Sequence, residues 1–164
     1  MSAAAASSTG AARANWLKVF AVMAVVLVLD QASKALVRAD VSVGEENELL
    51  PFLSIGHVHN DGVAFGFLGG GGTLLLVIVV CAITALVVFF SRNAGRPLMW
   101  IPTGLLLGGA FGNLLDRIRQ GYVTDFIQFP SFPSFNVADI AVTFGVISLV
   151  IVLELNARAE ARDA

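Results

Sequence analysis

Two Asn-x-x-Asp pairs in this chain have residue types that could do acid–base chemistry: Asn113 with Asp116 in "GNLLDR", and Asn136 with Asp139 in "FNVAD". Residues three apart share a helix face, so each pair would present an amide beside a carboxylate. Asp125, in "VTDFIQF", lies between the pairs. Two carboxylates in one poorly hydrated site cannot both ionise easily, so one keeps its proton near neutral pH. Such a pair could activate a water molecule with one member and protonate a leaving amine with the other.

The choice of partners within this group depends on neighbouring charge. Asp116 adjoins Arg117 and is near Arg119, and a cationic partner would hold it ionised. Asp125 has no neighbouring base, which favours Asp125 with Asp139 and leaves Asp116 with Asp139 as the rival pair. Spacing alone also allows a proton or cation path, or a purely structural polar network.

Composition predicts a membrane protein. The chain has 164 residues, of which 57% are hydrophobic and 13% charged, and its mean hydropathy is +0.82. A helix needs about 20 mostly apolar residues to cross a bilayer. Four segments meet this length, and they predict an all-α membrane protein with four transmembrane helices at 16–37, 73–90, 98–115 and 135–153. The second and third spans carry no charged residue before Asp116, which counts against a continuous ion path through the membrane. A non-enzymatic membrane scaffold is a further alternative, but it would not explain the three aspartates.

Charge placement predicts the orientation. Basic residues flank the termini and the second connection: Arg13, Lys18, Arg92, Arg96, Arg158 and Arg162. The positive-inside rule then puts both termini in the cytoplasm, and the first and third connections outside. With a net charge of −2 there is no broad basic field for nucleic acid.

The segments outside the spans carry weaker signals. Residues 1–15 are Ala/Ser-rich and predict a disordered cytoplasmic tail. The first span is predicted to be uncleaved and not part of a signal peptide. The membrane domain is predicted at 16–155, and residues 156–164 are predicted to be a second cytoplasmic tail. The first connection predicts a few short strands near the outer surface, with a flexible joint at Gly69–Gly72, and the third predicts an interfacial segment.

Four smaller features complete the predictions. His57 and His59 alternate on a strand, which favours solvated histidines over a metal site. Cys81, the only cysteine, is expected to be a small buried hydrophobe. Gly108 and Gly112 form a small-xxx-small face for close helix packing. In "DQASK", Asp30 and Lys34 are one helical turn apart, which predicts an ion pair at the end of the first span.

Taken together, "DQASK", "NDGVAFG", "GGAFGNLLDR", "YVTDFIQF" and "FNVADIA" resemble, in order, the motifs of the bacterial lipoprotein signal peptidases, also called signal peptidase II or prolipoprotein signal peptidase. The resemblance implies an aspartic endopeptidase of the bacterial plasma membrane, with its active site at the outer face. Its implied substrate is a diacylglyceryl-modified prolipoprotein, cut just before the lipidated cysteine.

The resemblance also assigns residues by matching motifs. It implies that Asp125 and Asp139 are catalytic and that no metal or cofactor is needed. It implies a set of residues that shape the site or bind substrate: Asn60, Gly62, Ala64, Phe65, Asn113, Asp116, Arg117, Asn136, Asp30 and Lys34. Membrane lipids are the other expected partner, and a monomer is the expected state.

Overall fold

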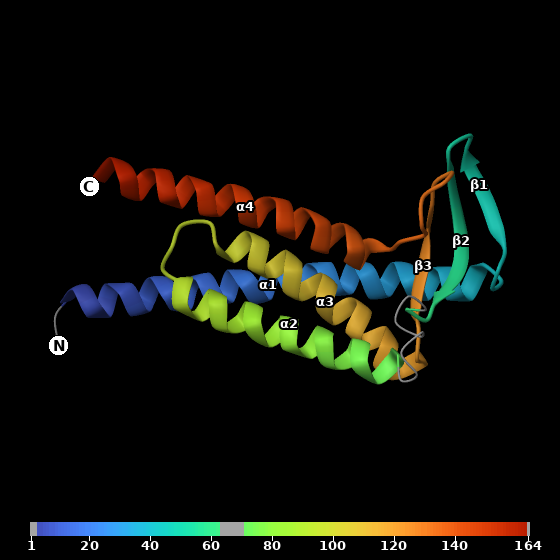
Figure 1. Ribbon diagram of the computed structural model, residues 1–164, viewed down its shortest axis with the longest axis horizontal. Helices are drawn as coiled ribbons and strands as arrows, with labels where there is room; N and C mark the ends of the chain where they lie inside the picture. The colour runs from blue at the N-terminus through green and yellow to red at the C-terminus, as the bar shows by residue number, and fades with distance from the viewer. Residues whose placement is uncertain (1–2, 63–70, 164) are drawn as a thin grey trace.

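Four helices form a bundle with a small antiparallel sheet at one end, while both termini lie at the other (Figure 1). The computed structural model describes residues 3–62 and 71–163. In chain order the elements are α1 (Ala3–Asp40), β1 (Glu46–Leu50), β2 (Leu53–Asn60), α2 (Gly71–Asn93), α3 (Trp100–Gln120), β3 (Val123–Gln128) and α4 (Val137–Asp163).

Three of these helices contain stretches long and apolar enough to cross a membrane: Gly10–Asp40, Thr73–Asn93 and Val137–Arg162. The remaining predicted span, 98–115, corresponds to α3, which falls outside that group. α3 packs against α1, α4 and α2, and nine of its residues are buried. A helix surrounded by other helices contacts little lipid, so its sequence can carry glycine and polar residues.

Glycines let α3 approach its neighbours closely, as predicted. A Cβ at Gly108 would meet the Val26 side chain of α1 at 2.7 Å, and one at Gly112 would meet Asp30 Oδ2 at 2.6 Å. Gly109, on another side of α3, faces the Ala138 carbonyl oxygen of α4. Gly108 and Gly112 therefore allow close packing of α3 on α1, and Gly109 allows close packing on α4.

The sheet has the order β1-β2-β3, with both pairs antiparallel. The few short strands predicted in the first connection are present as β1 and β2. β3 lies where an interfacial segment was predicted, and that prediction missed a strand because its partner β2 ends more than sixty residues earlier in the chain. The pairing of Val58 with Asp125 brings the first and third connections together.

Several local predictions differ from the structure. α1 begins at Ala3, so most of the segment predicted to be a disordered tail is helical. Cys81 is exposed on α2, not buried, because α2 turns much of its surface away from the bundle. Of the glycines predicted to be a flexible joint, Gly71 and Gly72 begin α2, while Gly69 and Gly70 lie outside the described residues.

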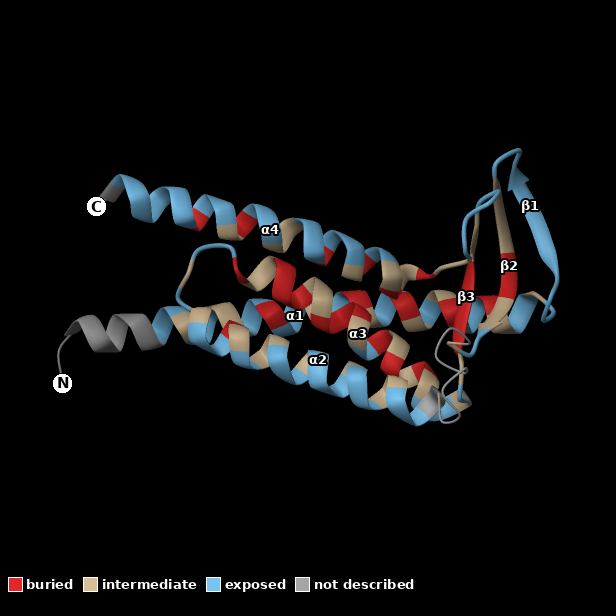
Figure 2. Cartoon of the chain, viewed as in Figure 1, coloured by how far each residue is buried: buried red, intermediate tan, exposed pale blue. Residues whose placement is uncertain are grey.

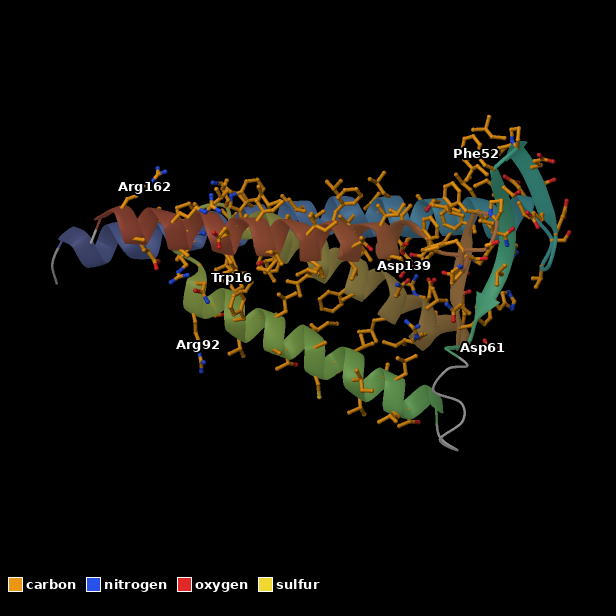
Figure 3. All side chains as sticks on the ribbon, turned by 45° about the horizontal axis from the view of Figure 1, so that its top comes forward. Trp16, Phe52, Asp61, Arg92, Asp139 and Arg162 are labelled. Carbon is orange, nitrogen blue, oxygen red and sulfur yellow. The ribbon has the colours of Figure 1, made fainter. Side chains whose placement is uncertain are left out.

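Buried residues lie along the inside of the bundle and on β2 and β3 (Figure 2), and their chemistry differs between the two ends. An apolar cluster that includes Val19, Phe90 and Met99 fills the end near the termini, with Trp16 packed against Phe90. Buried charged residues, by contrast, gather towards the sheet, where Asp139 lies in Figure 3. Large apolar side chains on the outer helix surfaces are exposed, as expected for a protein whose solvent there is lipid.

Candidate active site

The N-terminus of α4 positions Asp139. Asn136 precedes the helix, and its Oδ1 accepts the Asp139 N–H at 3.0 Å, while Asp139 Oδ2 accepts the Asn136 N–H at 3.1 Å. This reciprocal pair is a capping box with an aspartate at the third helical position. The Ala138 N–H donates to Asp30 Oδ1 of α1 at 2.9 Å. The same hydrogen bonds that begin α4 therefore fix the Asp139 carboxylate.

Asp125 lies on β3 with its side chain almost wholly buried. Its Oδ2 accepts from Asn60 Nδ2 at 2.8 Å and its Oδ1 from Asn136 Nδ2 at 2.6 Å. Burial raises the pKa of Asp125 to about 6; the Asn60 hydrogen bond opposes the rise, and the negative charge of Asp139 adds to it. Asp125 is therefore a carboxyl group that holds a proton more readily than an exposed aspartate.

Asn113, near the end of α3, links the two aspartates through Asn136. Its Nδ2 donates to Asp139 Oδ1 at 2.8 Å, and its Oδ1 accepts from Asn136 Nδ2 at 3.1 Å. The two Asn-x-x-Asp pairs thus meet, and the asparagine of the first binds the aspartate of the second. Asn136 donates to Asp125 from its side-chain amide and to the Asp139 carboxylate from its backbone N–H, so one residue bridges the candidate pair.

A buried ion cluster supports Asn113 from the side of α1. Lys34 Nζ lies 2.9 Å from Asp30 Oδ2, which confirms the predicted ion pair, and 3.0 Å from Asp116 Oδ2. It also donates to Asn113 Oδ1 at 2.9 Å. Sequence reasoning missed Gln31, whose Nε2 donates to Asp116 Oδ1 at 3.0 Å and to Asp30 Oδ2 at 3.1 Å. Its only signal was its place within "DQASK", on the same helix turn as the pair.

Asp116 is held inside this cluster. Its Oδ2 also accepts the Thr124 N–H of β3 at 3.2 Å, and its side chain is fully buried. Asp116 does contact a cation, as expected, but the cation is Lys34 of α1 and not an arginine adjacent to Asp116 in the sequence. Arg117 points elsewhere, because its Nη1 donates to the Asn113 carbonyl oxygen at 3.3 Å. Neighbours in sequence point to different sides of a helix, so Arg117 cannot follow Asp116 inward.

The first connection brings Asn60 to the site at the end of β2. Asn60 Oδ1 accepts the Gly62 N–H at 3.0 Å, and Gly62 has a φ of 68°, in the left-handed region that favours glycine. This turn leaves Asn60 Nδ2 free to bind Asp125. Ala64 and Phe65, the other predicted residues of this motif, lie outside the described residues.

The histidines of β2 are packed, not solvated as predicted. Their rings lie 5.1 Å apart between centroids, and His59 stacks on Tyr122 at 3.6 Å. His57 Nδ1 donates to the Val41 carbonyl oxygen at 2.8 Å. Within the described ranges, the buried Nε2 atoms of both histidines lack a hydrogen-bond partner. The pair helps to hold the sheet against the end of α1.

Two hollows reach the aspartates. One, of about 490 Å³, has Asp139 on its wall beside Ile140 and Phe144, and extends along the outer surface of α4. The other, of about 330 Å³, has Asp125 on its wall beside His59. Asn60 lines both hollows, as do Pro133 and Ser134. Each aspartate is therefore reachable, and the wall between the hollows is shared.

Comparison with known proteins bears directly on this polar site. The family model described as "Signal peptidase (SPase) II" matches residues 22–155, most of the chain and all of the polar cluster. The chain belongs to the signal peptidase II family. It is 41% identical over 143 residues to the lipoprotein signal peptidase of Moorella thermoacetica, covering 84% of this chain and 93% of that one.

Other members of the signal peptidase II family and a solved structure agree. The lipoprotein signal peptidase of Halothermothrix orenii is 39% identical over 136 residues, which are 82% of this chain and 94% of that one. A structure described as "Bacterial membrane enzyme structure by the in meso method at 1.9 A resolution" aligns with a TM-score of 0.77 and 35% identity, covering 82% and 91% of the two chains. The chain is a bacterial membrane aspartic peptidase that cleaves signal peptides from prolipoproteins.

Proposed function

We propose that Asp125 and Asp139 are the catalytic pair of this peptidase. The observation that carries the proposal is their shared, neutral set of donors: Asn136 contacts both carboxylates, and Asn60 and Asn113 bind one each. Neutral amides hold a carboxylate in place without forcing it to stay ionised, as a salt bridge would. The pair can then share one proton at a pH near the raised pKa of Asp125, as acid–base hydrolysis requires.

In the proposed reaction a water molecule binds between the two carboxyl groups. The ionised member takes a proton from the water, which attacks the scissile carbonyl carbon, while the protonated member polarises the carbonyl oxygen. A proton is then given to the leaving amine as the C–N bond breaks. The raised pKa of Asp125 favours it as the protonated member and Asp139 as the base.

The rival pair of Asp116 with Asp139 fits this chemistry less well. Asp116 has its oxygens in contact with Lys34, Gln31 and the Thr124 N–H. A carboxylate in a buried salt bridge stays ionised, and losing its charge would leave the lysine unpaired. We therefore assign Asp116 to the support of the site.

The proposed substrate is a prolipoprotein whose cysteine carries a diacylglyceryl group, cut just before that cysteine. The hollow beside Asp139 opens along the exposed apolar surface of α4, at Ile140 and Phe144. A lipidated peptide approaching through the membrane would meet the site from that side, with its acyl chains in the bilayer. Each methylene kept in lipid contributes about 0.8 kcal/mol, so the membrane would do much of the positioning.

The placement in the membrane belongs to the same proposal. All four helices would span the plasma membrane, with both termini in the cytoplasm and the sheet and aspartates at the outer face. The chain would act as a monomer, since one chain supplies both aspartates and all four donors. No metal or cofactor is part of the proposed reaction.

The test is cleavage of a purified diacylglyceryl-modified prolipoprotein by wild-type protein and by Asp125→Asn, Asp139→Asn and Asp116→Asn. We expect the first two to lower kcat about 10³-fold or more, because each removes one half of the acid–base pair. Asp116→Asn should retain partial activity. Wild-type activity in Asp139→Asn would overturn the mechanism, and loss confined to Asp116→Asn and Asp139→Asn would move the pair.

The unmodified prolipoprotein is the matched substrate control. We expect it to be cut much more slowly at the same concentration, because it lacks the acyl chains that fix its depth. Equal rates on the two substrates would contradict the proposed lipid requirement while leaving the peptidase activity itself intact.

A further inference from the structure

Lys34 is a buried cation with three acceptors arranged around it. Its side chain has no exposed surface, and its Nζ meets Asp30 Oδ2, Asp116 Oδ2 and Asn113 Oδ1 at 2.9, 3.0 and 2.9 Å. An ammonium has three N–H donors and no acceptor. Two of the three contacts balance charge, but the third is to a neutral amide and does not.

That third contact decides how the Asn113 carboxamide is oriented. A carboxamide has an acceptor end and a donor end of nearly the same shape. The acceptor end of Asn113 faces two donors, Lys34 and Asn136, and the donor end faces Asp139. The reversed orientation would put an NH₂ group against the ammonium, leaving buried donors unpaired at a cost in free energy.

The orientation of the Asn113 carboxamide determines whether Asp139 receives a hydrogen-bond donor or faces another acceptor. With the amide as it stands, Asp139 Oδ1 receives an N–H from Asn113, while Oδ2 receives the Asn136 N–H. A reversed Asn113 would place its oxygen against Asp139, and two acceptors would then face each other unless Asp139 took up a proton. Asp139 would thereby lose the ionised form that the proposed reaction uses as its base.

Among the charged groups of the described residues near Asp139, Lys34 is the one that binds the side-chain oxygen of Asn113. Asp125 faces it from β3, and Asp30 and Asp116 lie beyond Asn113 in contact with the lysine. Arg117 contacts the backbone oxygen of Asn113, which does not depend on the orientation of its side chain. In the part of the chain that the structure describes, Lys34 and Asn136 are the donors that face the Asn113 side-chain oxygen.

We propose that Lys34 is a positioning residue for the peptidase reaction, fixing the Asn113 carboxamide so that Asp139 keeps an N–H donor. The proposal rests on the proposed catalytic pair. It assigns to Lys34 a role beyond the ion cluster in which it sits.

The test is a double-mutant cycle measured by kcat and KM: wild type, Lys34→Met, Asn113→Ala and Lys34→Met/Asn113→Ala. We expect Lys34→Met to lower kcat about 100-fold, the effect of a small misplacement, with KM little changed. Once Asn113 is removed the lysine has nothing to orient, so the double variant should match Asn113→Ala within about twofold. Multiplication of the two single losses would overturn the proposal.

Gln31→Leu is the matched control. Gln31 binds the same two carboxylates as Lys34, but its third hydrogen bond goes to the Gly112 carbonyl oxygen instead of the Asn113 side chain. Its effect on kcat should be small and should multiply with that of Asn113→Ala. Equal kcat losses in Gln31→Leu and Lys34→Met would show that the cluster acts only as a helix clamp, which would overturn the proposal.

Lys34→Met leaves the buried Asp30 and Asp116 carboxylates without their cation, which could prevent folding. A series with matched charge is therefore measured in parallel. Lys34→Met/Asp116→Asn leaves the net charge of the cluster unchanged, and Asp116→Asn alone is its reference. The same loss of kcat is expected relative to that reference, and wild-type-like kcat would contradict the proposal. Failure of the catalytic pair would be seen separately, as retained activity in Asp125→Asn or Asp139→Asn.

Discussion

Asp125 and Asp139 accept their hydrogen bonds from three asparagine side chains and one backbone N–H. Within the described residues, the salt bridges of the protein involve neither aspartate. Cations stand one group away, behind Asn113. At the scale of single residues, neutral amides therefore hold the two carboxylates in position. The charged groups of the ion cluster act on them only from a distance.

The pKa of Asp125 predicts the pH dependence. Burial raises that pKa to about 6, and the protonated form needed by the proposed mechanism is lost as the pH rises through it. We expect kcat/KM, which reports on the free enzyme, to fall about tenfold per pH unit above that value. A kcat/KM that stays level to pH 8 would contradict the assignment of Asp125 as the acid.

Asn60→Ala is the matched variant for this pH profile. The Asn60 hydrogen bond favours the ionised form of Asp125, so removing it should raise the pKa of Asp125 further and move the fall in kcat/KM to higher pH. Thermal unfolding without substrate gives an independent check. A folded pKa above the unfolded value contributes stability that is complete below about pH 4 and lost as the pH rises through about 6, a loss that Asp125→Asn should lack.

At the scale of elements, α3 is the helix on which the site depends. Its glycines meet α1 and α4, and its last turns carry Asn113 and Asp116 to the sheet. Gly121 ends it in the left-handed conformation, with a φ of 85°, and β3 follows directly. A shift of α3 would therefore separate Asn113 from Asp139 and Asp125 from Asn136 together.

Gly109→Ala tests this dependence. Its Cβ would meet the Ala138 carbonyl oxygen, a backbone atom that cannot move without moving the first turn of α4. We expect a loss of about 1–3 kcal/mol in the free energy of unfolding, from overpacking, together with lower kcat. Gly10→Ala on α1 is the control, since its Cβ would meet nothing within 4 Å. Equal thermal stability of the two variants would contradict the close packing.

The sequence predicts these contacts only where they are local. The pairing of Asp30 with Lys34 follows from helical spacing, and so does the shared helix face of Asn136 and Asp139. The Asn60 to Asp125 bond spans 65 residues and depends on the pairing of β2 with β3. Periodicity carries no information on such pairing, so within the sequence only neighbouring charge and the family resemblance point to the candidate pair.

The burial of a side chain is hard to predict on a helix that faces other helices on one side and lipid on the other. Cys81 lies in an apolar span, which predicts burial in a water-soluble protein, but α2 turns that position outward. Its exposure to lipid costs no more than burial among side chains, so composition cannot distinguish the two. Gln31 is the opposite case, a polar residue inside an apolar span. Its side chain binds Asp116, but nothing in the sequence around Gln31 indicates that partner.

At the scale of the whole molecule, the two ends differ in charge. Arg92 and Arg162 lie at the end that holds the termini, and Asp61 and Asp139 at the sheet end (Figure 3). Between them the outer surfaces of α1, α2 and α4 expose apolar side chains such as Val25, Val77 and Val150. This arrangement is what the positive-inside rule requires if the sheet faces outward.

Cysteine labelling tests that orientation. In a Cys81→Ser background, Asn47→Cys would place a thiol on exposed β1, and Ala159→Cys one on the exposed end of α4. A membrane-impermeant maleimide added to intact spheroplasts should label Asn47→Cys only, and permeabilised spheroplasts should label both. Labelling of Ala159→Cys in intact spheroplasts would reverse the proposed topology.

The capping box at the start of α4 has a consequence for inhibitor resistance. Asn136 and Asp139 begin a helix and, in the proposed reaction, also hold the catalytic geometry, so each substitution there would damage folding and activity at once. A compound anchored on these two side chains and on the adjacent backbone N–H would leave few viable escape mutations. Resistance would then be expected at the apolar rim, around Ile140 and Phe144, where side chains can change without disturbing the helix start.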